Sequence, residues 1–160
     1  MDLSVVIVNR FTQRFLLPCV ESVLASHGAY SVEVIVVDES PLDGGARDLR
    51  ERYPAIAVID DDSDRGYAHA NNLGLMRARG RYLLTLNPDT LLPLGALARL
   101  VAWMDANPRA GVVGPKLVRA DGTMDLACRR SFPTPLNALF RYAGLARIFP
   151  RNRRFAGYNL

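Results

Sequence analysis

Residues 81–90 read Arg-Tyr-Leu-Leu-Thr-Leu-Asn-Pro-Asp-Thr, an apolar segment that runs directly into a short polar turn. Two earlier apolar segments have the same pattern, because one is followed by Asn9 and the other by Asp38. Open α/β sheets bind ligands in the crevice beyond the carboxyl ends of their strands. We therefore expect one shared cleft at the ends of these three segments, with a metal ion or a phosphate near Asp89.

Strand and helix patterns alternate through the first two thirds of the chain. Apolar runs predict strands at 3–8, 32–37, 55–59 and 81–86. Amphipathic spacing predicts helices at 15–24, 46–52, 67–79 and 94–106. This order favours an α/β domain with a mostly parallel sheet flanked by helices on both faces. Two finer expectations are that the strand at 81–86 is covered on both faces, and that Gly80 ends the helix before it.

The pattern changes from Gly111 onward. Short strand-like pieces on either side of Asp121-Gly122 predict a small β-hairpin. Residues 136–145 have the spacing of one helix, and the tail that follows is irregular. The second part of the chain is therefore not a continuation of the strand–helix alternation.

Composition places the chain among ordinary soluble globular proteins. Of its 160 residues, 49% are hydrophobic and 22% are charged. No apolar run approaches the roughly 18 residues of a membrane-spanning helix, and no secretory signal is visible at the N-terminus. Cys19 and Cys128 match no metal-binding spacing and are expected to be free thiols in a reducing compartment. These features favour a cytoplasmic protein.

The net charge of +4 is unevenly distributed. All 16 acidic residues precede position 126, whereas residues 126–160 contain seven arginines and no acid. A tail of this kind suits an anionic membrane surface, a nucleic acid or a phosphorylated ligand. The alternative is a solvated basic surface, or one that pairs with a further portion of a longer protein.

The polar residues at the expected cleft each have a functional and a structural interpretation. Asp89 offers the carboxylate oxygen that Mg²⁺ and Mn²⁺ prefer when they bridge diphosphate oxygens, or it is an ordinary turn residue. Asp38 accepts hydrogen bonds from a base or a ribose, or it caps a turn. Asn87 bonds sugar hydroxyls or its own turn. Arg65, which precedes a helix-opening glycine, suits a phosphate.

Taken together, these segments resemble the inverting family 2 glycosyltransferases of GT-A fold, particularly their bacterial rhamnosyltransferase-like branch. The matching stretches are Ser4–Asn9, Val34–Asp38, Asp64–Gly74, Gly80–Thr90, Gly114-Pro115 and Cys128–Pro135. They occur in order and cover nearly the whole chain. The sequence departs from the family pattern at Arg10-Phe11 and at Glu39-Ser40-Pro41.

The resemblance implies a division of the chain and roles for its residues. Residues 1–128 would form a GT-A nucleotide-sugar-binding domain, and residues 129–160 a basic extension that begins an acceptor-side region. Asn87-Pro88-Asp89 stands where the family carries its D-x-D motif, so Asp89 would hold Mg²⁺ or Mn²⁺ on the donor diphosphate. The remaining donor contacts would come from Val8, Asn9, Asp38, Arg65, Asn72 and Asn87.

The resemblance also implies the partners. The donor would be a UDP- or dTDP-sugar, and the acceptor a hydroxyl of a cell-surface saccharide or glycolipid at the inner face of the membrane, with no nucleic acid involved. Inversion needs a carboxylate base, which this family carries well after position 160, so no catalytic residue is assigned. We expect the donor-binding part of a truncated enzyme. The alternative is a non-catalytic assembly module whose basic tail contacts an anionic membrane or polymer.

Overall fold

The computed structural model describes residues 1–128, 132, 134–149, 152 and 154–155. Contacts divide the chain into two compact units, Met1–Ala110 and Gly111–Leu160. The packing therefore changes earlier along the chain than the boundary expected at residue 128. That boundary remains a prediction about function.

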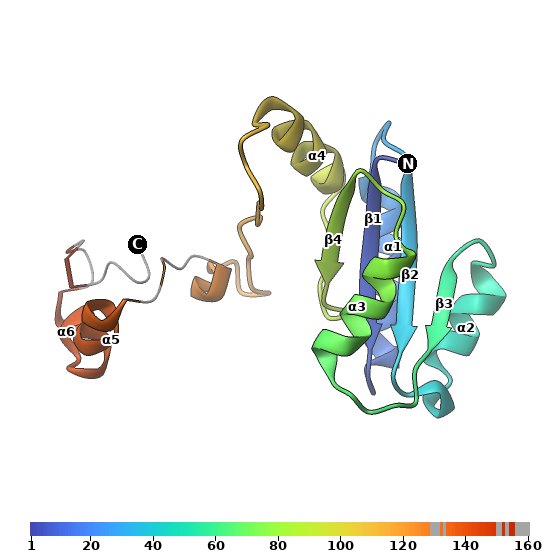
Figure 1. Ribbon diagram of the computed structural model, residues 1–160, viewed down its shortest axis with the longest axis horizontal. Coiled ribbons are helices and arrows are strands. Elements are labelled where there is room, and N and C mark those ends of the chain that lie inside the picture. The colour runs from blue at the N-terminus through green and yellow to red at the C-terminus, as the bar shows by residue number, and fades with distance from the viewer. Residues whose placement is uncertain (129–131, 133, 150–151, 153, 156–160) are drawn as a thin grey trace. The chain divides into compact units, whose positions relative to one another are not determined.

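The first unit is built on a parallel sheet of four strands in the order β3-β2-β1-β4 (Figure 1). The strands are β1 (Leu3–Asn9), β2 (Val32–Asp38), β3 (Ala57–Asp60) and β4 (Tyr82–Leu86). Asn9 pairs in register with Asp38, and Asp38 with Asp60, so the first three strands end in line. The predicted parallel sheet with polar residues along one carboxyl edge is confirmed.

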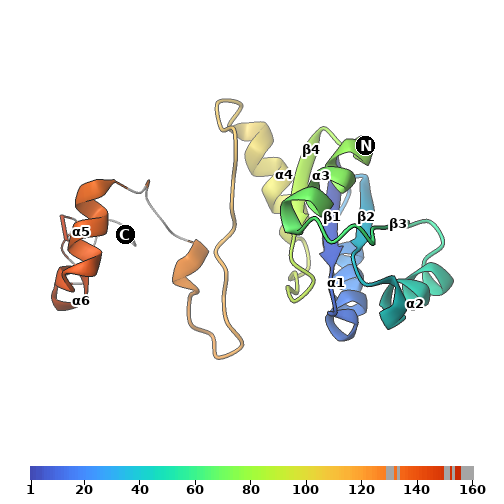
Figure 2. The same ribbon diagram turned by 60° about the horizontal axis from the view of Figure 1, so that its bottom comes forward.

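Helices cover both faces of this sheet. On one face lie α1 (Gln13–Ser26), α2 (Gly45–Arg52) and α4 (Ala96–Ala106), with a 3₁₀ turn at Pro41–Asp43 before α2. On the other face lies α3 (Tyr67–Arg77), which packs against β1 and β2 (Figure 2). The expected helix on each side of a parallel sheet is therefore present.

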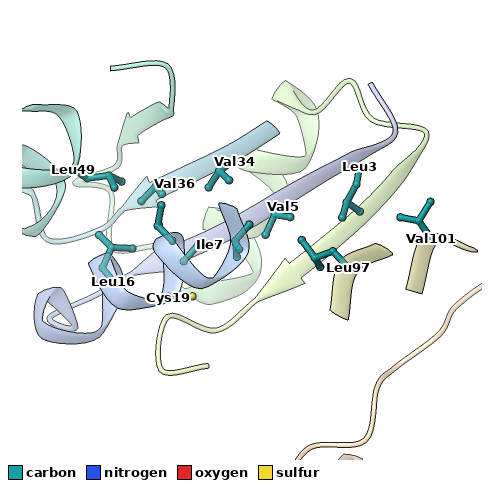
Figure 3. Close-up of a cluster of buried hydrophobic side chains, with 12 residues drawn as sticks. Leu3, Val5, Ile7, Leu16, Cys19, Val34, Val36, Leu49, Leu97 and Val101 are labelled. Carbon is teal, nitrogen blue, oxygen red and sulfur yellow. The ribbon is translucent and has the colours of Figure 1, made fainter. Parts of the chain in front are cut away.

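The strand residues alternate between two cores, as the pleat of a strand requires. Val5 and Ile7 of β1 join Leu16 of α1, Leu49 of α2 and Leu97 of α4 in the larger core (Figure 3). The smaller core lies under α3 and consists of Val8, Val37 and Ala70. The apolar residues of β1 and β2 thus have helices to pack against on both faces, which is why these strands are nearly continuous in hydrophobic residues.

A polar junction holds the amino ends of the strands together. The buried Ser4 hydroxyl of β1 donates to Glu33 Oε1 of β2 at 2.5 Å and accepts from the Gly80 N–H at 2.7 Å. The Arg79 N–H also donates to Glu33 Oε1, at 2.7 Å. Because α3 ends at Arg77, Gly80 does not cap it as expected. Its role is instead to let the chain entering β4 approach Ser4 closely.

We predict that Glu33→Gln lowers the free energy of unfolding by about 1–2 kcal/mol at pH 7, because an amide accepts these hydrogen bonds more weakly than a carboxylate. Burial raises the pKa of Glu33, but hydrogen bonds from Ser4 and Arg79 outweigh it and hold the pKa below its ordinary value of 4.5. The carboxylate therefore stabilises the fold above about pH 4.5, and this contribution is lost as the pH falls through the lowered folded-state pKa.

Urea unfolding of the wild type and of Glu33→Gln between pH 3 and pH 7 measures this difference. Glu51→Gln, at an exposed carboxylate of α2, is the matched control and is expected to change the free energy of unfolding little. A wild-type advantage over Glu33→Gln that is the same at pH 3 and pH 7 would contradict the assignment.

The expectation that the strand at 81–86 is covered on both faces is wrong. β4 lies at the edge of the sheet, and because α3 packs over β1 and β2, Leu83 is 54% exposed rather than covered on both faces. Trp103 of α4 is 46% exposed, because α4 turns Leu97 and Val101 toward the sheet instead.

The second unit has little regular structure among its described residues. The expected hairpin has its turn, with Gly122 in the left-handed region at φ 82°, but only one antiparallel bridge, between Val118 and Met124. The last part of the expected return strand is a 3₁₀ turn, Leu126–Cys128. The single helix expected at 136–145 is two, α5 (Pro135–Tyr142) and α6 (Leu145–Ile148), because Gly144 adopts a left-handed conformation between them.

No helix among the described residues is long and apolar enough to cross a membrane.

Candidate functional site

A pocket of about 260 Å³ opens at the carboxyl edge of the sheet, within the first unit. Its lining comes from four places in the sequence: β1 and the loop after it, the residue after β2, the first residue of α3, and the turn after β4. The lining residues are Val8, Arg10, Thr12, Glu39, Tyr67, Asn87, Pro88 and Asp89. The cleft predicted beyond the strand ends is therefore a pocket of this molecule.

Asn9 and Asp38 form a buried polar pair behind this lining, each with no exposed surface. The Asn9 side-chain amide donates to Asp38 Oδ1 at 2.9 Å, and its oxygen accepts from the Thr12 hydroxyl at 2.7 Å. The Ser40 N–H donates to the same Asp38 oxygen at 3.1 Å. This network ties the loop after β1 to the loop after β2, and so it fixes the backbone on which Arg10 and Thr12 reach the pocket.

Two carboxylate oxygens near the end of β2 have unused accepting capacity. Asp38 Oδ2 and Glu39 Oε1 are both buried, and neither has a hydrogen-bond partner among the described residues. A buried acceptor without a donor costs about 1–3 kcal/mol. A ligand that brings N–H or O–H groups to this end of the pocket would offset that cost.

Side chains of two helices, α3 and α1, hold the turn after β4 in place. The Tyr67 hydroxyl at the start of α3 donates to Asn87 Oδ1 at 3.0 Å, and the Cys19 thiol of α1 contacts the Asn87 carbonyl oxygen at 3.7 Å. Thr90 N–H donates back to the same carbonyl at 3.2 Å. Asp89, between these anchors, is exposed and lines the pocket. Its carboxylate is thus available to a ligand on a turn that is fixed.

An ion pair joins the two loops that flank the pocket. Arg10 Nη2 lies 2.7 Å from Asp64 Oδ1. Asp64 and Phe11, the residue after Arg10, both have positive φ, 48° and 54°. Non-glycine residues rarely adopt this conformation and hold it where the surrounding structure demands it. Arg10 therefore reaches the pocket with its charge already partly balanced.

The structure brings together only some of the residues proposed from the sequence. Val8, Asn87 and Asp89 line the pocket, and Asn9 and Asp38 lie directly behind it. Arg65 and Asn72 are exposed and do not belong to the lining. Their roles as donor contacts remain predictions.

Thr12 and Tyr67 are pocket residues that the sequence did not single out. Both begin a helix or immediately precede one, since Thr12 stands before α1 and Tyr67 opens α3. A helix that starts at the carboxyl edge of a parallel sheet presents its first residues to the crevice. This position is the signal that would have identified them.

Burial and the nearby Asp89 carboxylate raise the pKa of the Cys19 thiol to about 12. The thiolate is the reactive form of cysteine, so we predict that Cys19 resists alkylation in the native protein. Measured with iodoacetamide at pH 8 on a Cys128→Ser variant, native labelling is expected to be at least about 100-fold slower than labelling in urea. Rapid native labelling would show that this thiol is not buried in the larger core in solution.

Comparison with known proteins identifies the family. The family described as "Glycosyl transferase family 2" matches residues 4–156 of the chain. The chain belongs to glycosyl transferase family 2. This family 2 chain is 31% identical over 106 residues to the succinoglycan biosynthesis protein ExoO of Rhizobium meliloti, a match that covers 66% of the chain and 30% of ExoO.

A second relative is the N-acetylglucosaminyl-diphospho-decaprenol L-rhamnosyltransferase of Mycobacterium tuberculosis. The family 2 chain is 27% identical to it over 135 residues, which cover 76% of the chain and 42% of the relative. The chain therefore spans less than half the length of both relatives.

Solved structures agree on the fold. TarS of S. aureus superimposes with a TM-score of 0.67 at 18% identity, over 86% of this family 2 chain and 40% of TarS. The mannosyltransferase PcManGT of Pyrobaculum calidifontis, solved in complex with GDP-Man and Mn²⁺, gives a TM-score of 0.64 at 27% identity, over 74% of the chain and 36% of PcManGT. The first unit thus has the GT-A glycosyltransferase fold.

The pocket of this family 2 chain offers a divalent metal one exposed carboxylate, that of Asp89. The described residues contain no cluster of three or more His, Cys, Asp or Glu side chains that would enclose an ion. Mg²⁺ commonly binds through one or two carboxylates while substrate phosphates and water complete its coordination. The exposed Asp89 carboxylate at the pocket fits that open kind of site and does not fit a metal held by protein alone.

Proposed function

We propose that this family 2 chain binds a UDP- or dTDP-sugar in the pocket at the carboxyl edge of its sheet, together with Mg²⁺ or Mn²⁺ at Asp89. The observation that carries the proposal is the convergence of Val8, Asn87 and Asp89 on one pocket. They come from two segments that are far apart in the sequence: Val8 lies near the carboxyl end of β1, and Asn87 and Asp89 lie on the turn after β4. Family membership and a carboxylate exposed on a fixed turn favour a nucleotide diphosphate over other ligands.

Different residues of the pocket would contact different parts of the nucleotide sugar. Glu39, with Asp38 behind it, supplies the unpartnered acceptor oxygens, which suit the N–H groups of a base or the hydroxyls of a ribose. Asp89 lies on the turn after β4, where the diphosphate and its metal would be held. Asn9 fixes the position of Asp38, and Tyr67 fixes Asn87.

The chemistry proposed is transfer of the sugar, with inversion, to an acceptor hydroxyl. Negative charge grows on the diphosphate as the sugar departs, and a divalent metal at Asp89 would supply Lewis-acid stabilisation of that charge. Asp89 would hold that metal at the diphosphate, and the anchored turn keeps the Asp89 carboxylate in place. The carboxylate that deprotonates the acceptor is proposed to lie beyond these residues, since positions 126–160 contain no acid.

The acceptor proposed is a saccharide or glycolipid at the cytoplasmic face of the membrane. The name of the mycobacterial relative specifies a lipid-linked sugar as its acceptor. The acid-free, arginine-rich end of the present chain would hold the protein near a membrane that carries such a lipid. No nucleic acid is part of the proposal.

Calorimetric titration of the whole chain with UDP-GlcNAc and with a dTDP-hexose tests donor binding. In Mn²⁺ at least one of the two is expected to bind, and removal of the metal with EDTA is expected to weaken that binding at least about tenfold, a difference of about 1.4 kcal/mol. If neither compound binds in the presence of Mn²⁺, the proposed donor site does not exist in this chain.

The second candidate function is a non-catalytic assembly module, which the arginine-rich end of the chain favours. It predicts salt-sensitive association with an anionic membrane or polymer that requires no nucleotide. Removal of residues 141–160 should abolish this association. Donor binding in the calorimeter would decide against a purely non-catalytic role.

A further inference from the structure

Helix α5 exposes an apolar stripe. Leu136, Leu139 and Tyr142 follow one another at three-residue spacing, which places them along one side of a helix. Their side chains are 52%, 59% and 90% exposed. Large apolar residues that lie together in the open mark a surface for binding another molecule more often than scattered ones do.

The packing around α5 does not use this stripe. Phe140 of the same helix meets Phe155 edge to face, with ring centroids 5.1 Å apart, and Phe149 lies 5.5 Å from Phe155. These rings hold α5 and α6 together with the segment that follows. The stripe of Leu136, Leu139 and Tyr142 is left over after the local core has formed.

The charge around the stripe has one sign. Residues 126–160 contain seven arginines and no acidic residue. Among the described residues of this stretch, Arg147 and Arg154 are exposed, and neither guanidinium pairs with a described carboxylate. A surface that is apolar along one helix and cationic around it matches one kind of partner closely, an anionic lipid bilayer, which offers hydrocarbon beneath negative phosphate groups.

We propose that α5 docks on an anionic membrane surface, with Leu136, Leu139 and Tyr142 in the interfacial layer and with Arg147 and Arg154 at the lipid phosphates. Neither the apolar stripe nor the basic segment is sufficient alone, because each by itself gives weak, reversible membrane binding. The two together give stable attachment. This inference deepens the proposed membrane contact by naming the surface, and it does not depend on donor binding.

Flotation of the whole chain with vesicles of phosphatidylcholine containing about 30% phosphatidylglycerol tests the proposal. The wild type is expected to float with these vesicles at low salt and much less with pure phosphatidylcholine or at 0.5 M NaCl, where charges are screened. The double variant Leu136→Ser/Leu139→Ser is expected to lower the partition coefficient at least tenfold. The matched control Leu42→Ser/Leu94→Ser changes two leucines of the first unit that are 100% and 77% exposed, and should float like the wild type.

Three results would overturn the proposal. The first is equal flotation of the stripe variant and the wild type, and the second is equal binding of the wild type to neutral and anionic vesicles. The third is a wild type that is a dimer by light scattering and a stripe variant that is a monomer. The last result would assign the stripe to a second copy of the chain. Calorimetry with nucleotide sugar should give the same affinity for the stripe variant and the wild type, so failure of membrane docking and failure of donor binding are separate observations.

A fluorescence measurement guards against a stripe variant that merely unfolds α5. In a Trp103→Phe background, Tyr142→Trp places the only tryptophan of the chain on the stripe. Its emission is expected to shift to shorter wavelength when anionic vesicles are added and to stay unchanged with neutral ones. Unchanged emission with anionic vesicles that bind the protein would place the contact elsewhere.

Discussion

Asp89→Ala is expected to abolish metal-dependent binding of a nucleotide sugar, with a loss of affinity of at least about a hundredfold. Removing a partner that merely orients a metal ligand already costs 10–100-fold, and Asp89 is proposed to be the ligand itself. The side chain is exposed at the pocket on a turn held by Tyr67 and Cys19, so its removal should leave the fold unchanged.

Calorimetric titration with Mn²⁺ and with EDTA measures this effect directly. The variant is expected to bind donor equally weakly under both conditions, whereas the wild type binds better with Mn²⁺. Asp62→Ala is the matched control, because Asp62 is an exposed carboxylate in the loop after β3 that does not line the pocket. If Asp89→Ala keeps the wild-type dependence on Mn²⁺, the metal is held by another residue.

Gly80→Ala is expected to lower the free energy of unfolding by about 3 kcal/mol, at the upper end of the usual cost of overpacking, and the melting temperature by roughly 10 °C. A Cβ at this position would collide with the backbone nitrogen of Ser4 and would lie 2.7 Å from the carbonyl carbon of Leu3. Backbone atoms inside a parallel sheet cannot move aside as a flexible side chain can. In the variant, β1 must therefore move away from the residues that lead into β4. This movement breaks the hydrogen bond from the Gly80 N–H to the Ser4 hydroxyl.

Gly111→Ala is the control for the Gly80 prediction. Neither glycine has positive φ, and a Cβ on Gly111 would meet nothing within 4 Å. Gly111→Ala is expected to leave the free energy of unfolding, measured with urea, within about 0.5 kcal/mol of the wild-type value, as surface substitutions usually do. Equal effects of the two substitutions would mean that Gly80 does not mediate a close approach of backbones in solution.

The sequence predicts the first unit well because its strands face two helical layers. Residues such as Val5 and Ile7 are buried whatever lies at the sheet edges, and their continuous hydrophobic runs carry that information. These hydrophobic runs do not predict the order of the strands in the sheet. Leu83 and Val5 look alike in sequence, yet β4 is an edge strand and β1 is central, so Leu83 is exposed.

The second unit is predicted less well for a related reason. Asp121-Gly122 specifies a turn through its local conformational preference, and the turn is present. Strands need partners as well as turns, and the pieces around Val118 and Met124 form a single bridge. Gly144 likewise divides the expected helix, through a left-handed conformation that apolar spacing does not reveal.

The candidate site shows the same limit. Val8, Asn87 and Asp89 are found together because they adjoin strand ends, which the sequence marks clearly. Tyr67 reaches the pocket by its hydrogen bond to Asn87 across twenty positions, a contact that only the folded chain defines. Arg65 and Asn72 are exposed and lie outside the lining of the pocket, and their roles as donor contacts remain predictions.

The polar junction at Ser4, Glu33 and Gly80 has a consequence for how this protein tolerates change. It lies at the amino ends of the strands, whereas Asp89 and the pocket lie at the carboxyl ends, roughly 20 Å away along a seven-residue strand. Sites so far apart, with no shared partner, contribute additively to free energy. Mutations that repair or weaken the junction should therefore change the stability of the chain without altering which donor it accepts, so that the two properties are free to vary separately within one small sheet.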